Sequence, residues 1–149
     1  MNWRLILMLS LFGPVMGALM VLGVIPRGAD RFLWAGVVGL CAFLAAKQEP
    51  ERALLHGALI GFINGASSTL IQAFFVDTLA ANNPWMVEAM AKQPPGFDFE
   101  FFVFMLVPFI GVAGGGMTGL LAMWIARARA RRNDVPGPAS GSSSGPGKS

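Results

Sequence analysis

The stretch Leu54–Val76 contains neither an acidic side chain nor a permanent cation, and this constrains the fold more than any other feature of the chain. At about 1.5 Å per residue, a helix of this length crosses a hydrocarbon layer of about 30 Å. Only 13% of the 149 residues are charged, against about 25% in an ordinary soluble domain. The sequence therefore predicts an all-α membrane protein, and its formal charge of +3 gives no reason to expect nucleic acid as a partner.

Three further apolar runs complete a predicted bundle of four transmembrane helices within residues 1–132. The predicted spans are residues 5–25, 32–46, 54–76 and 101–125. The second run measures only about 22 Å as a helix, so a segment that enters the membrane and turns back is its alternative. A cleaved secretory signal is the alternative for the first run, which is longer than the roughly 7–15 residues of a signal core.

The segments outside these spans have their own predicted structures. Residues 84–92 predict a short amphipathic helix on the membrane surface between the third and fourth spans, with Asn83 as its cap and Pro84 at its first position. Pro14 and Pro108 are predicted to bend the first and fourth spans. The tail at 133–149 is rich in Gly, Pro and Ser, cannot bury apolar surface, and is predicted to be disordered in the cytoplasm.

The cations favour one orientation of the four-span bundle. Eight of the eleven Lys and Arg residues fall on one side of it and three on the other. Because positive residues are enriched in cytoplasmic segments, this bias predicts both termini in the cytoplasm. The three on the other side are Arg27, Arg31 and Lys92.

Two rows of glycine at every fourth position are the most specific pattern in the chain. Such rows let helix backbones approach closely. They predict packing of the third helix on the fourth, with a homodimer seam as the alternative. The rows are Gly57, Gly61 and Gly65, then Gly111, Gly115 and Gly119.

Polar side chains follow one face of the third predicted helix. Lipid offers them no hydrogen-bond partner, so this face is expected to look inward at other helices. It predicts hydrogen bonding between helices, with the lining of a solute or ion path as the alternative. The residues are Asn64, Ser67, Ser68, Thr69 and Gln72.

Few other residues point to chemistry. His56, the only histidine, is predicted to sit at the interface among headgroups, with a proton relay or metal ligand as the alternative. Cys41, the only cysteine, is predicted to be a small buried hydrophobe. No catalytic motif is present, so we expect no catalytic residue, metal site or cofactor. Four arginines after the last span are predicted to contact lipid headgroups or only to set the topology: Arg127, Arg129, Arg131 and Arg132.

In layout the chain resembles the uncharacterised small four-span proteins of bacterial inner membranes, and that resemblance implies the same location. It lacks the first-helix glutamate of small multidrug exporters, and its charge bias differs from that of small dimeric fluoride channels. We expect a non-enzymatic accessory protein that packs with itself or with a larger membrane complex. A small permease or channel lined by the polar face of the third helix is the alternative, and a membrane enzyme using His56 is a third possibility.

Overall fold

The computed structural model describes residues 1–94 and 96–133, and all regular structure in this part of the chain is helical. In chain order the elements are α1 (Trp3–Ser10), α2 (Phe12–Val21), α3 (Asp30–Gln48), the 3-10 turn η1 (Pro50–Arg52), α4 (Ala53–Phe74), α5 (Val76–Asn82), α6 (Pro84–Ala91) and α7 (Phe99–Asn133).

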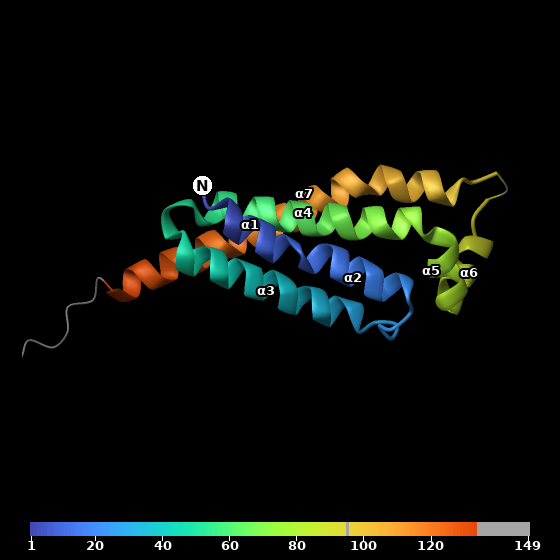
Figure 1. Ribbon diagram of the computed structural model, residues 1–149, viewed down its shortest axis with the longest axis horizontal. Helices are drawn as coiled ribbons and strands as arrows, with labels where there is room; N and C mark the ends of the chain where they lie inside the picture. Colours follow the sequence, from blue (N-terminus) through green and yellow to red (C-terminus); the bar gives the residue numbers. More distant parts are fainter. Residues whose placement is uncertain (95, 134–149) are drawn as a thin grey trace, which may run out of the picture.

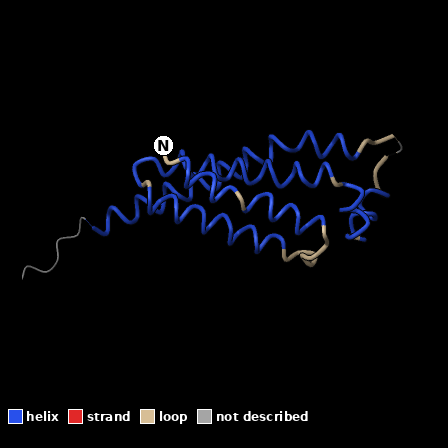
Figure 2. The backbone as a smooth tube through the Cα atoms, viewed as in Figure 1, coloured by secondary structure: helices blue, strands red, loops and turns tan. Residues whose placement is uncertain are grey.

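Four rods lie side by side, and α4 packs most extensively against the others (Figure 1). The first rod is formed by α1 and α2 in succession. It packs on one side of α4, whereas α7 packs along α4 on another side and α3 covers the start of α4 and the later part of α7. The connections gather at the two ends of the bundle (Figure 2). One end holds the N-terminus, the turn between α3 and α4, and the end of α7.

Three helical segments are long and apolar enough to cross a membrane: Trp3–Val21, Pro50–Phe74 and Phe99–Asn133. The fourth rod, α3, is not among them, and the predicted four-span bundle is therefore not confirmed. The α3 helix includes Asp30, Arg31 and Lys47. With 19 residues it is about 28 Å long, which exceeds the predicted span at 32–46. Its ends stay helical because an acid in the first turn and a base in the last turn interact favourably with the helix dipole.

The two prolines inside predicted spans behave differently. The first rod is interrupted at Leu11, between α1 and α2 and three residues before Pro14. The bend predicted from Pro14 stays a prediction. Proline has no N–H to donate to the carbonyl four residues earlier, and its ring displaces that carbonyl. Pro108 lies inside α7 without interrupting it. At 35 residues α7 is about 52 Å long and continues past the predicted span end at residue 125 through the arginines.

The connection between α4 and α7 holds one helix that the sequence did not indicate and one that it did. The unexpected helix is α5. The expected one is α6, which begins with Pro84 as predicted, but the side chain of Asn83 makes no capping hydrogen bond to it. Asn83 thus occupies the N-cap position of α6, as predicted, without a side-chain capping bond. Of the predicted tail, Asn133 ends α7, and residues 134–149 lie outside the described residues.

The two glycine rows face one another in the interface between α4 and α7. A methyl group added at Gly61 would collide with the carbonyl oxygen of Gly114 and the hydroxyl of Thr118. At the other five positions an added Cβ would lie 2.6–2.9 Å from an atom of the facing helix, closer than real Cβ contacts allow: Gly57, Gly65, Gly111, Gly115 and Gly119.

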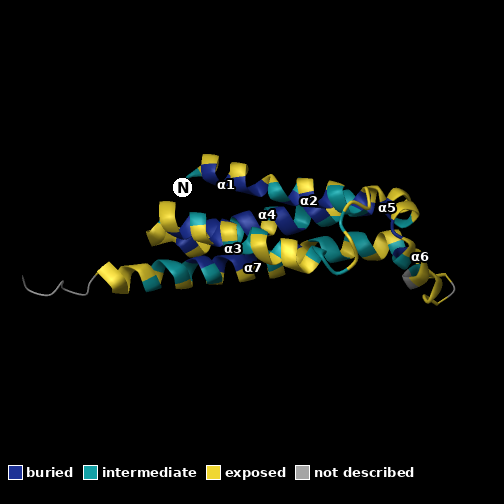
Figure 3. Cartoon of the chain, turned by 90° about the horizontal axis from the view of Figure 1, so that it is seen from below, coloured by how far each residue is buried: buried dark blue, intermediate teal, exposed yellow. Residues whose placement is uncertain are grey.

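The first rod approaches α4 by the same means on another side. An added Cβ at Gly13 would lie 2.5 Å from both the Cα of Asn64 and the Oγ of Ser67, and one at Gly17 would lie 2.9 Å from the carbonyl oxygen of Ser68. Burial is therefore concentrated along α4 and the faces turned toward it, while the outer faces of the other rods are exposed (Figure 3).

Two adjacent glycines of α7 allow a matched test of this packing. We expect Gly115→Ala to lower the free energy of unfolding by about 1–3 kcal/mol, because its methyl group meets the carbonyl oxygen of Ala58. Gly116→Ala should change it by about 0.5 kcal/mol or less, since nothing lies within 4 Å of an added Cβ there. Denaturant unfolding in detergent measures both, and equal effects would contradict the packing.

Candidate functional site

Buried polar side chains gather where the first rod meets α4, α5 and α6. We call this set the polar seam; it consists of Ser10, His56, Asn64, Ser68 and Asn83. Thr118, the other buried polar side chain of the described residues, lies between α4 and α7 and donates to the carbonyl oxygen of Gly114 in its own helix.

Asn64 occupies the centre of the polar seam and fills the break in the first rod. Its Oδ1 accepts a hydrogen bond from the N–H of Gly13 at 2.6 Å, and its Nδ2 donates to the carbonyl oxygen of Leu9 at 3.0 Å. In an unbroken helix, Gly13 and Leu9 would be bonded to each other. The side-chain amide of Asn64, which belongs to the neighbouring helix α4, therefore takes the place of one backbone hydrogen bond of the first rod.

We call the paired hydrogen bonds between Asn64 and the first rod the junction. Cys41 of α3 lies beside it. Its Sγ is 3.9 Å from the carbonyl oxygen of Leu9 and 3.9 Å from Nδ2 of Asn64. The side chain is buried, and the thiol makes only these weak sulfur contacts. Cys41 thus closes the third side of the junction.

His56 fastens the start of the first rod to α4. Its Nε2 accepts a hydrogen bond from the N–H of Asn2 at 3.1 Å, which leaves Nδ1 to donate to the carbonyl oxygen of Arg52, also at 3.1 Å. The ring is completely buried. The prediction of a histidine among headgroups is wrong, because the chain start folds over the ring. Asn2 in turn caps α1 by accepting from the N–H of Leu5.

Two consecutive asparagines hold the other end of the first rod. Asn82 donates from Nδ2 to the carbonyl oxygen of Val21 at 2.9 Å, and Asn83 donates to that of Met20 at 3.0 Å. The chain then turns away at Gly23, whose φ of +68° favours glycine. An added Cβ there would lie 2.7 Å from the carbonyl oxygen of Asn82. The carbonyl of Val21 at the end of α2 is satisfied from α5. The carbonyl of Met20, which also accepts from the N–H of Gly23, gains a second hydrogen bond from the residue that precedes α6.

The remaining residues of the predicted polar face bond within α4. Ser67 donates to the carbonyl oxygen of Asn64, and Thr69 donates to that of Gly65. Gln72 donates to both the hydroxyl and the carbonyl oxygen of Ser68. Of the five predicted residues, only Asn64 hydrogen-bonds to another helix.

Ser10 is the unusual member of the polar seam. Its Oγ is buried and has no hydrogen-bond partner among the described residues. It lies one turn before Pro14, where the helical ladder of the first rod is already incomplete. Among the side-chain N and O atoms described for the polar seam, it is the buried one without a hydrogen-bond partner.

Two cavities lie away from the predicted polar face. One of about 240 Å³ lies between the loop that follows α2 and the start of α6, and the Arg27 guanidinium stacks 5.9 Å from the centre of the Trp85 ring at its edge. The other, of about 230 Å³, lies along the end of α7. None of Asn64, Ser67, Ser68, Thr69 and Gln72 lines either cavity.

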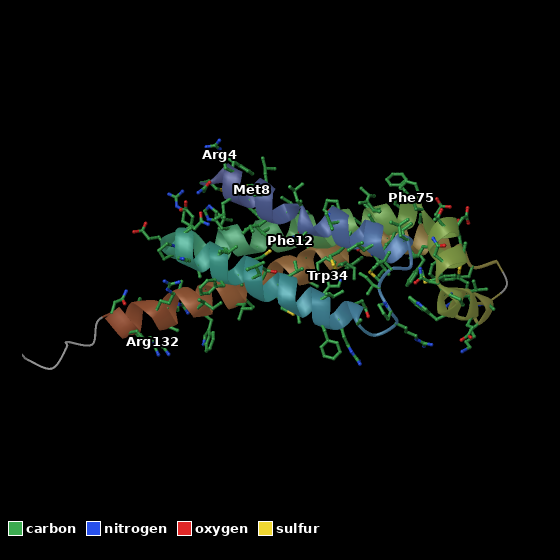
Figure 4. All side chains as sticks on the ribbon, turned by 60° about the horizontal axis from the view of Figure 1, so that its bottom comes forward. Arg4, Met8, Phe12, Trp34, Phe75 and Arg132 are labelled. Atoms are coloured by element: carbon green, nitrogen blue, oxygen red, sulfur yellow. The ribbon has the colours of Figure 1, made fainter. Side chains whose placement is uncertain are left out.

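The arginines after the predicted last span form the exposed end of α7. Figure 4 shows Arg132 at the tip of this helix, away from the other rods. Arg129 lies over the Phe43 ring of α3, with 5.7 Å between Cζ and the ring centre. In the part of the chain that the structure describes, no group of three or more His, Cys, Asp or Glu residues is placed to hold a metal ion.

Comparison with known proteins finds no matching family model, no matching curated protein and no matching solved structure.

Sequence reasoning missed four contributors to this site: Asn2, Gly13, Asn82 and Asn83. Each acts on a backbone group or on a side chain more than fifty residues away. The local signal was the position of the three asparagines near helix ends, where free carbonyl and N–H groups occur.

The amides of α4 allow a test of the junction. We expect Asn64→Ala to lower the free energy of unfolding by about 1–3 kcal/mol, because it strands the N–H of Gly13 and the carbonyl of Leu9 in a buried site. Gln72→Ala, which removes an amide bonded within its own helix, should have an effect of about 0.5 kcal/mol or less.

Cys41 reports the same junction without any added label site, since it is the only cysteine. Thiol labelling requires the junction to open, so Asn64→Ala should accelerate it by about tenfold for each 1.4 kcal/mol lost. Equal labelling rates for the Asn64 and Gln72 variants would count against the junction.

Proposed function

We propose that this chain is a four-span protein of the bacterial inner membrane, with both termini in the cytoplasm, that serves as a non-enzymatic accessory component of a membrane complex. The observation that carries the proposal is the use made of the buried polar groups. His56, Asn64 and Asn83 each bond to backbone groups of the first rod. The hydrogen-bonding capacity of these side chains is used to hold the helices of the bundle together.

The distribution of cations supports the proposed orientation. The end of the bundle that holds the N-terminus carries seven described Lys and Arg residues, and the opposite end carries three (Figure 1). The positive-inside tendency then favours the first end as the cytoplasmic one, provided that α3 crosses together with the other rods. The seven are Arg4, Lys47, Arg52, Arg127, Arg129, Arg131 and Arg132.

Glycines with open space beside them indicate where a partner helix would pack. The glycine rows that suggested self-association are occupied by the interface between α4 and α7. Gly36 and Gly39 on α3 and Gly116 on α7 have nothing within 4 Å of an added Cβ. Small residues let a second backbone approach in a membrane, so these faces suit a partner helix better than the rows do.

Fusions to alkaline phosphatase test the topology, since this enzyme is active only outside the cytoplasm. We expect activity for a fusion after Gly28 and none for fusions after Glu49 or Arg132. The first two fusions differ only by α3, so equal activity for them would show that α3 does not cross. A fluorescent protein after Arg132 serves as the cytoplasmic control.

Photo-crosslinkers in place of Gly36 and Gly116 test the accessory role. We expect discrete protein adducts at these positions and chiefly lipid adducts at the exposed Val112, which serves as the matched control. The adduct mass separates a second copy from another protein. If the protein carried a solute into vesicles and the Asn64→Leu, Gln72→Leu double variant lost this uptake, the protein would instead be a permease. If it catalysed a reaction and His56→Ala abolished the activity, it would be an enzyme.

A further inference from the structure

The end of α7 continues as a helix for eight residues after Ile125. A continuous helix fixes the spacing of the four arginines along its axis and around it, so different arginines lie on different sides of the helix. The structure separates them into two pairs.

One pair lines a hollow along α7. The hollow has a volume of about 230 Å³ and is lined by Trp124, Ile125, Ala128, Arg129 and Arg132. Positions three and four apart share one side of a helix, which brings the two guanidinium groups to the same side as the indole. The other pair, Arg127 and Arg131, does not line the hollow.

Arg129 is held in place by a neighbouring helix. Its guanidinium stacks over the Phe43 ring of α3, with Cζ 5.7 Å from the ring centre. A cation over an aromatic face is attracted to it. A guanidinium that is already ordered loses less freedom when it binds an anion.

The lining combines two kinds of surface. Trp124 is 67% exposed, and tryptophan is enriched at the level of lipid headgroups. Ile125 and Ala128 are apolar, whereas two guanidinium groups offer the paired donors that suit a phosphate. An apolar floor beside two cations, one of them held by an aromatic ring, matches a molecule with a phosphate at one end and a hydrocarbon chain at the other.

We propose that the hollow seats the phosphate of an anionic phospholipid between Arg129 and Arg132, with the start of an acyl chain along Trp124 and Ile125. This rests on the proposed membrane insertion, with the end of α7 at the cytoplasmic surface. Lipid binding is then assigned to one pair of arginines rather than to all four.

The four arginines provide a charge-matched test. The full chain is purified in detergent, and binding of phosphatidylglycerol is measured for wild type, for Arg129→Gln with Arg132→Gln, and for Arg127→Gln with Arg131→Gln. Each guanidinium near an anionic lipid contributes about fivefold, so the first variant should bind about 25-fold more weakly. The second should bind within about twofold of wild type.

Three outcomes would overturn the proposal. They are equal weakening in both double variants, equal binding of phosphatidylcholine by wild type, and competition by inorganic phosphate as strong as that by the lipid. Retention of all three proteins in membranes washed with carbonate is measured first. If the wild-type protein were washed out of the membranes, the proposed membrane insertion would be overturned. If it were retained but did not prefer anionic lipid, only the proposed phospholipid site would be overturned.

Phe43→Leu tests the seat with every charge intact. It keeps an apolar side chain but removes the ring under Arg129, so binding of phosphatidylglycerol should weaken by about threefold. Because Phe43 is exposed at the α3 surface, the fold should be unaffected. Unchanged binding would show that Arg129 is not positioned by the ring.

Discussion

The fold depends on two hydrogen bonds between the side chain of Asn64 and the backbone of the first rod. Pro14 breaks the helical ladder in a place where lipid and packed side chains offer no water. The amide of Asn64 accepts from the N–H of Gly13 and donates to the carbonyl oxygen of Leu9, so the two groups of this lost helical hydrogen bond are satisfied. One side chain of α4 thereby supports the interrupted first rod inside the bundle.

These hydrogen bonds require the two backbones to lie close together, and the glycines permit that close approach. Gly13 brings the first rod so near to α4 that a Cβ would touch the backbone of Asn64. On another side of α4, the glycine rows bring α7 equally near. In a membrane, association of helices relies on such packing and on hydrogen bonds between them, since lipid removes most of the hydrophobic driving force. α4 is central because it is approached closely from both sides.

Periodicity and composition were sufficient to predict the elements of this fold other than α5, but not its polar contacts. The apolar runs, the break near Pro14 and the short helix at Pro84 follow from local chemistry, and the structure contains each of them. The buried state of His56 and the partners of Asn82 and Asn83 depend on where the first rod lies. A single sequence gives no register between helices, so these long-range bonds could not be inferred.

Register also connects the interior of the bundle to its charged end. The glycine rows fix how far α7 is displaced along α4, and Phe43 of α3 meets Arg129 only at that displacement. A slip of α7 by one glycine repeat, four residues, would move the arginines by about 6 Å. A shift of that size is a large part of the depth of a headgroup layer, given a hydrocarbon core of about 30 Å and a bilayer of about 40–45 Å in all. The packing of α4 on α7 therefore sets the height at which the arginines stand, and a buried glycine can influence a surface that it never touches.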